Sequence, residues 1–246
     1  MVLGMWLIII FVLLYEPIIG YFDYQKFKIA VKEKANVRSH YYLKVMIGLW
    51  VPTIFIFILV FLTELNLKDI GITFPNIDTN TMGKAITYSI FVIASLYLLS
   101  VLYFCIGYHF SEKIRTKFIQ AKEKELNTES FSDILPITSK EKKIWNYVSL
   151  TAAVTEEIIY RAFLIFALSY IFPELSIWLV IIFSSLLFGL AHTYQGFSGV
   201  IKTSIVGILF SCIYIGLGSI LPLILLHFLI DYLAMLEDSE TQEVHH

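Results

Sequence analysis

IWNYVSLTAAVTEEIIYRAFLIFALSYI, residues 144–171, is an apolar stretch long enough to cross a bilayer, and it carries Glu156, Glu157 and Arg161 near its middle. A membrane helix needs about 20 apolar residues to cross roughly 30 Å of hydrocarbon. An unpaired charge at the centre of such a helix costs about 2.5–3.5 kcal/mol on insertion scales. The stretch therefore predicts a membrane-spanning helix whose charged side chains face the interior of a helical bundle.

The rest of the chain has the composition of a membrane protein. Of its 246 residues, 58% are hydrophobic and 15% charged, whereas soluble domains are about 45–50% apolar and about 25% charged. Apolar stretches bounded by charges or turn residues lie at Val2–Tyr21, Leu43–Leu62, Ala85–Tyr108, Ile144–Ile171, Ile177–Tyr194, Val200–Leu217 and Ile220–Leu236. The expected fold is all-α, a polytopic transmembrane bundle of about seven to eight helices. An eighth, shorter helix is expected in the loop Asn66–Met82 or Glu112–Lys124.

Lys and Arg residues predict the orientation, because they gather in cytoplasmic loops close to the ends of spans. Two loops are rich in them, and the basic residues of these loops are Lys26, Lys28, Lys32, Lys34 and Arg38, then Lys113, Arg115, Lys117, Lys122, Lys124, Lys140, Lys142 and Lys143. An odd number of spans then places the N-terminus outside and the tail from Glu237 in the cytoplasm. The net charge of -2 leaves no basic face for nucleic acid.

Few ionisable side chains remain at membrane depth in the C-terminal half, and outside the turns they are Glu156, Glu157, Arg161, His192, His227 and Asp231. Residues four apart share a helix face, so Glu157 and Arg161 can form an ion pair. Glu156 points elsewhere and has no local cation. His227 and Asp231 also lie one turn apart. Polar patches from three helices are therefore expected to meet inside the bundle.

Three carboxylates, one guanidinium and two imidazoles in such a cluster give an excess of negative charge. A low dielectric tolerates this excess only if a carboxylate keeps a proton or a cation binds. Both outcomes suit hydrolysis. A desolvated Glu can take a proton from water, with a nearby His sharing that task or stabilising the oxyanion. A divalent metal held by His and carboxylate ligands would instead activate its bound water.

Three motifs in order carry a resemblance to a known family: EEIIYR at 156–161 reads as EExxxR, FGLAH at 188–192 as FxxxH, and HFLID at 227–231 as HxxxD. The chain resembles the CPBP family, also called Abi or CAAX protease type 2-like, which contains intramembrane endopeptidases. The similarity extends over about Pro136 to Leu236. It implies N-terminal transmembrane helices and loops at 1–135 and a catalytic transmembrane core at 136–246.

The resemblance also implies a role for each site residue. Glu156 would be the general base that activates water, helped by His192. Glu157 and Arg161 would organise the site, and His227 would face the oxyanion.

The last motif departs from the pattern of the prenyl-protein peptidases, which have Asn where this chain has Asp231. An ionised Asp cannot donate to an oxyanion, so Asp231 must be protonated, must orient His227 or must ligate a cation. The family has been described both as metalloproteases and as metal-independent glutamate proteases, and we favour the second mechanism. If a metal such as zinc is bound, its expected ligands are Glu156, His192, His227 and Asp231.

The sequence thus predicts an intramembrane endopeptidase of a prokaryotic cell membrane, which acts on a membrane-associated peptide or lipidated protein in a cavity open to the cytoplasm. Membrane lipid is the other expected partner. Two alternatives remain open: a non-catalytic bacteriocin-immunity or scaffold protein, and a proton or cation transporter. A purely structural Glu157–Arg161 pair and a packing pair of His227 with Asp231 also stay open.

Overall fold

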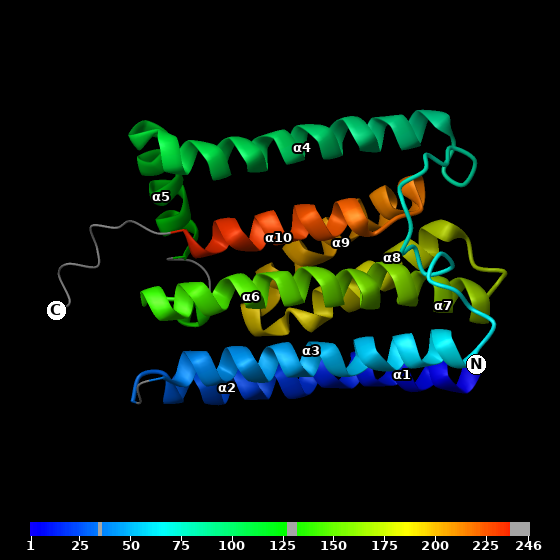
Figure 1. Ribbon diagram of the computed structural model, residues 1–246, viewed down its shortest axis with the longest axis horizontal. Helices are drawn as coiled ribbons and strands as arrows, with labels where there is room; N and C mark the ends of the chain where they lie inside the picture. Colours follow the sequence, from blue (N-terminus) through cyan, green and yellow to red (C-terminus); the bar gives the residue numbers. More distant parts are fainter. Residues whose placement is uncertain (34–35, 127–131, 237–246) are drawn as a thin grey trace.

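The computed structural model describes residues 1–33, 36–126 and 132–236. Within these ranges the chain is helical and contains no strand. Long helices lie side by side along a common direction (Figure 1). The predicted all-α bundle is therefore confirmed, while the tail from Glu237, with its terminal His245 and His246, lies outside the described residues.

The N-terminal half starts with one continuous helix that runs from α1 (Val2–Leu14) through a π-helical turn, η1 (Tyr15–Gly20), into α2 (Tyr21–Ala30). It continues with α3 (Val37–Leu62), α4 (Lys84–Phe110), α5 (Glu112–Leu126) and a 3-10 turn, η2 (Ser132–Ile134). The C-terminal half contains α6 (Ser139–Glu156), the π-helical segment η3 (Glu157–Phe163), α7 (Leu164–Ile171), α8 (Ile177–Ala191), the 3-10 turn η4 (Thr193–Gln195), α9 (Gly196–Leu217) and α10 (Leu221–Met235).

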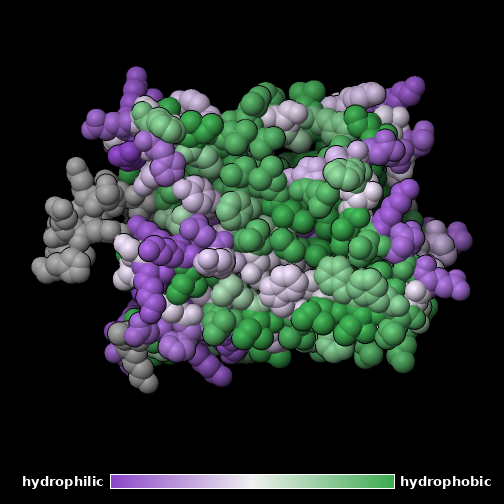
Figure 2. Space-filling model, in the orientation of Figure 1, coloured by the Kyte–Doolittle hydropathy of each residue, from purple (hydrophilic) through white to green (hydrophobic). Residues whose placement is uncertain are grey.

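Among the described residues, four helices are both long and apolar enough to cross a membrane: Val2–Ala30, Val37–Leu62, Lys84–Phe110 and Thr193–Leu217. α8 and α10 are apolar but shorter, and the helix formed by α6, η3 and α7 contains the charged residues. On the face in view in Figure 2, hydrophobic side chains form a belt between two hydrophilic ends. The chain is an integral membrane protein.

The two basic segments of the chain lie at the same end of the bundle, where α2 is joined to α3 and where α5 packs (Figure 1). This agrees with the prediction that both face one side of the membrane. The additional helix is α5, so the helix predicted for one of two loops lies in Glu112–Lys124 and not in Asn66–Met82. Residues 66–82 form turns and extended segments instead.

α6 begins at Ser139, before the apolar stretch at Ile144, because a capping box starts it. The Oγ1 atom of Thr138 accepts a hydrogen bond from the Glu141 amide at 3.2 Å, and Glu141 Oε2 accepts from the Thr138 amide at 3.0 Å. These bonds satisfy amides that a helix start leaves unpaired.

The helix formed by α6, η3 and α7 is central to the bundle. α6 packs against α3 and α10, and η3 contacts α3, α8 and α9. α8 and α9 approach closely because Gly189 has no side chain: a Cβ atom there would overlap Ser204 Oγ and lie 2.7 Å from the Val200 carbonyl oxygen. The large buried core surrounds η3. The packing thus places Glu157 and Arg161 among helices from both ends of the chain.

Candidate active site

Glu157 and Arg161 form a buried ion pair within the π-helical segment η3. Arg161 Nη1 donates to Glu157 Oε1 at 3.3 Å, and the two side chains are 1% and 0% exposed. π-helical turns are rare and are frequent at functional sites. The spacing of the two residues predicted their pairing, but a regular α-helix was expected here, and that expectation was wrong for Glu157–Phe163.

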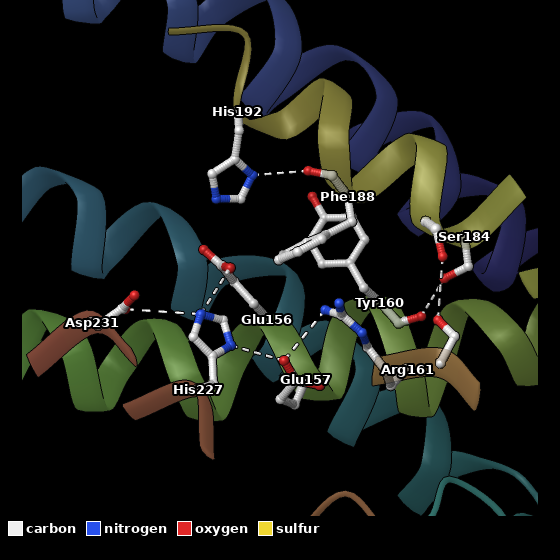
Figure 3. A network of polar contacts seen from close by, with 11 residues as sticks. Glu156, Glu157, Tyr160, Arg161, Ser184, Phe188, His192, His227 and Asp231 are labelled. Carbon is white, nitrogen blue, oxygen red and sulfur yellow. Dashed lines mark hydrogen bonds and ion pairs between the residues drawn. The ribbon is translucent and has the colours of Figure 1, made fainter. Parts of the chain in front are cut away.

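His227 of α10 reaches the same carboxylate from across the bundle. Its Nδ1 atom donates to Glu157 Oε1 at 2.8 Å. Its Nε2 atom lies 3.7 Å from Glu156 Oε2 and 3.8 Å from Asp231 Oδ2, distances of charge attraction rather than of hydrogen bonds. One imidazole therefore joins the three carboxylates that the sequence singled out (Figure 3).

α10 is held in position against α6 by aromatic contacts near the basic end. Trp145 Nε1 donates to the Asp231 carbonyl at 3.2 Å. The Trp145 ring packs edge-on against Tyr42, whose hydroxyl donates to the Ile134 carbonyl at 2.6 Å. These contacts fix the position of α10 along the bundle axis, and with it the position of His227 relative to Glu156.

His192 lies at the end of α8, one turn beyond Phe188. Its Nδ1 atom donates to the Phe188 carbonyl at 2.9 Å, so in the neutral imidazole the Nε2 atom is the acceptor. Figure 3 shows the Glu156 carboxylate between the rings of His192 and His227 in this view. The structure thus brings the polar groups of all three motifs into one region.

Aromatic rings enclose the Arg161 guanidinium. Its central carbon lies 4.0 Å from the centre of the Phe188 ring and 5.3 Å from that of Phe210, both within the range of cation–π attraction. The rings of Phe188 and Phe210 also meet His227 edge-on, at 6.3 and 6.1 Å between centroids. The phenylalanine of the FxxxH motif therefore packs between the arginine and both histidines.

The three carboxylates differ in the exposed fraction of their side chains. The Asp231 side chain is 30% exposed, that of Glu156 is 13% exposed, and that of Glu157 is fully buried. α10 runs toward the basic end of the bundle (Figure 1), so Asp231, one turn after His227, lies nearer that end. Exposure of the carboxylates thus increases toward the basic end.

The sequence did not identify several residues of this region. Ser184 Oγ donates to the Tyr160 carbonyl at 2.5 Å inside η3, and Phe210 packs against Arg161. No local pattern points to either residue. Glu16 lies inside the continuous helix Val2–Ala30, in the π-helical turn η1. The feature of the sequence that could have marked Glu16 as a candidate site residue is a carboxylate within an apolar span.

The expected metal ligands do not form a ready metal site. Among the described residues, no three His, Cys, Asp or Glu side chains are placed to hold one metal ion together. Glu156 and Asp231 approach the same Nε2 atom of His227, which leaves that nitrogen between two carboxylates rather than directed at a shared ion.

Residues 142–233 match the family described as type II CAAX prenyl endopeptidase Rce1-like. No curated protein and no solved structure matches the chain. The matched segment contains the EExxxR, FxxxH and HxxxD motifs, agrees with the CPBP resemblance and supports an intramembrane CAAX-protease kind of function. Residues 142–233 are thus similar to the Rce1-like family of type II CAAX prenyl endopeptidases, as the CPBP resemblance predicted.

Proposed function

We propose that the protein hydrolyses a peptide bond of a membrane-associated peptide or lipidated protein, with Glu156 as the general base. The observation that carries this proposal is the state of the Glu156 carboxylate. Its Oε2 atom is buried and has no hydrogen-bond partner among the described residues. Glu157 Oε2 is also without a partner, but Glu157 Oε1 is engaged by both Arg161 and His227, which hold that carboxylate in place. Glu156 is thus the carboxylate free to bind and deprotonate a water molecule.

The first step uses Glu156 and His192 together. A water held between them gives a proton to the Glu156 carboxylate, while the Nε2 lone pair of His192 orients its other hydrogen. The oxygen then attacks the carbonyl carbon of the scissile peptide bond. Binding in a site that excludes bulk water strengthens these contacts.

The second step places negative charge on the carbonyl oxygen of the substrate. His227 in its cationic form has an N–H at Nε2 that can donate to this oxyanion, because Nδ1 is occupied by Glu157. When the C–N bond breaks, the leaving amine takes the proton held by Glu156. Asp231, 3.8 Å from His227 Nε2, favours the cationic form of that ring by its charge.

The basic end of the bundle is proposed to face the cytoplasm, following the distribution of Lys and Arg. The N-terminus is then outside, and the site opens toward the cytoplasm on the side of Asp231. A prokaryotic cell membrane is the proposed location.

The test is cleavage of a peptide library by purified protein in liposomes, with and without a chelator. Glu156→Gln and His192→Ala are expected to lower the rate by about 10²–10⁴-fold, and the chelator is expected to leave it unchanged. Glu174→Gln, in the exposed turn between α7 and α8, is the control. Cleavage at the wild-type rate by Glu156→Gln contradicts the proposal, and ion flux without cleavage would indicate a transporter.

A further inference from the structure

The first helix contributes a further carboxylate to the site, although it lies outside the segment that matches the family. Glu16 sits in the π-helical turn η1, which contacts both α8 and the turn after His192. Thr193 Oγ1 donates to the Pro17 carbonyl at 3.0 Å, so η1 is fixed directly to the residue that follows His192. Glu16 also lies within electrostatic range of Glu156 and Tyr160.

The Glu16 carboxylate lies directly against a glycine of the same helix. A Cβ atom at Gly20 would lie 3.3 Å from Glu16 Oε2, so the carboxylate extends over Gly20 toward the α2 side of the turn. Tyr24 follows Gly20 by one turn. Any larger side chain at Gly20 would crowd the carboxylate.

Tyrosine rings form a continuous series of contacts from α2, next to Glu16, to His192. The ring centroids of Tyr24 and Tyr194 are 5.3 Å apart, and those of Tyr194 and His192 are 5.8 Å apart. Tyr41 completes the wall, 6.4 Å from Tyr24 and within electrostatic range of Glu16. Tyr41 and Tyr194 are only half-buried. Aromatic faces beside a carboxylate are the surroundings that attract an ammonium or guanidinium group.

Glu16 has no cationic partner among the described residues. The nearby Lys44 forms an ion pair with Asp23 instead, at 2.5 Å. Arg161 is paired with Glu157, and His227 lies among Glu156, Glu157 and Asp231. Lys28 Nζ lies over the Tyr24 ring, 5.9 Å from its centre, so among the described residues the charge of Glu16 is not matched by an ion pair of its own.

We propose that Glu16 is a specificity-determining residue, which receives a Lys or Arg side chain of the substrate next to the scissile bond. This inference rests on the proposed peptidase function. Glu16 and Glu156 repel a free carboxylate between them, whereas a cationic side chain gains both the attraction of Glu16 and contact with Tyr41 and Tyr194. The preferred substrates are thus basic near the cleavage site.

The test compares three series of otherwise identical peptides in which Lys, norleucine or Glu is moved residue by residue across the scissile bond. The wild type is expected to prefer Lys at one position. Glu16→Gln is expected to raise KM for that Lys peptide at least about tenfold, since one partner of a partly buried charge pair is removed. The KM of the norleucine peptide should stay the same. Glu16→Lys should reverse the preference toward Glu.

Glu174→Gln serves as the matched control and should leave the preference unchanged. Binding of the Lys peptide to Glu156→Gln, with and without Glu16→Gln, measures the same selectivity without turnover. Cleavage by the wild type with no preference for Lys, or equal loss for Lys and norleucine peptides in Glu16→Gln, overturns the role of Glu16 and leaves the peptidase proposal standing. Absence of any cleavage overturns the peptidase proposal, and the binding comparison then decides whether Glu16 selects cations.

Discussion

His227 Nδ1 lies 2.8 Å from Oε1 of Glu157, on a carboxylate with no exposed surface. Because a carboxylate oxygen only accepts, this bond assigns the Nδ1 hydrogen and turns the Nε2 atom toward Glu156 and Asp231. Glu157 also accepts from Arg161 through the same oxygen. The orientation of His227, the proposed oxyanion donor, therefore depends on the fully buried carboxylate of Glu157.

Replacing Glu157 by Gln should lower both stability and activity. Breaking a buried ion pair by removing one partner costs about 3–5 kcal/mol, because the other charge stays buried without compensation. Thermal unfolding in detergent would measure the first effect and peptide cleavage the second. The double variant Glu157→Gln with Arg161→Met should recover most of the stability but not the activity. Recovery of both would show that the pair serves packing alone.

Replacing Asp231 by Asn should have a smaller effect than replacing Glu156 by Gln. Asp231 Oδ2 lies 3.8 Å from His227 Nε2, too far for a hydrogen bond, so it acts through charge and an amide of equal size keeps the packing. We expect a fall in kcat of about tenfold or less, because general acid–base catalysis by Glu156, worth about 10²–10⁴-fold, is retained. A loss equal to that of Glu156→Gln would instead assign Asp231 to the reacting atoms.

Replacing Ser184 by Ala should weaken the π-helical segment. Its hydroxyl donates to the Tyr160 carbonyl at 2.5 Å, and both groups are buried. Leaving that carbonyl without its donor is expected to cost about 1–3 kcal/mol and to lower the cleavage rate, because Glu156 precedes this segment. Ser185→Ala is the control, since Ser185 Oγ meets only Ser211 Oγ, at 3.4 Å. Equal melting temperatures of the two variants would contradict the importance of the Tyr160 bond.

Replacing Gly189 by Ala should separate α8 from α9. The added methyl group would overlap Ser204 Oγ and lie 2.7 Å from the Val200 carbonyl oxygen, and backbone cannot move aside as a flexible side chain can. Overpacking of this kind costs typically about 1–3 kcal/mol, occasionally more. Gly207→Ala, whose nearest neighbour would be 3.1 Å away, should be milder in thermal unfolding. A Gly189→Ala variant as stable as Gly207→Ala would mean that the helices adjust.

The helical bundle could be predicted because hydropathy alone marks apolar helices, and the meeting of Glu156, His227 and Asp231 could be predicted because charges in lipid must face one another. The π-helical form of Glu157–Phe163 could not. It depends on contacts such as that of Ser184 with Tyr160, which are distant in sequence.

The π-helical turn around Glu16 could not be predicted for a related reason. The residue before a proline usually leaves the helical conformation, so Glu16-Pro17 locally favours a helix end. The chain instead continues as a π-helical turn, and the Pro17 carbonyl binds Thr193 of a distant turn. A local preference was overruled by a contact that no local pattern contains.

The π-helical segment η3 has a consequence for how this site tolerates change in chain length. A π turn holds about one residue more than an α turn, and one residue corresponds to a rotation of about 100° around the helix axis. Deleting a single residue from Glu157–Phe163 would allow a regular helix in which α6 and α7 stay in phase, but residues within the segment would shift around the axis relative to Glu156. Such a deletion should therefore preserve the bundle while it disrupts the contacts of Glu157 and Arg161.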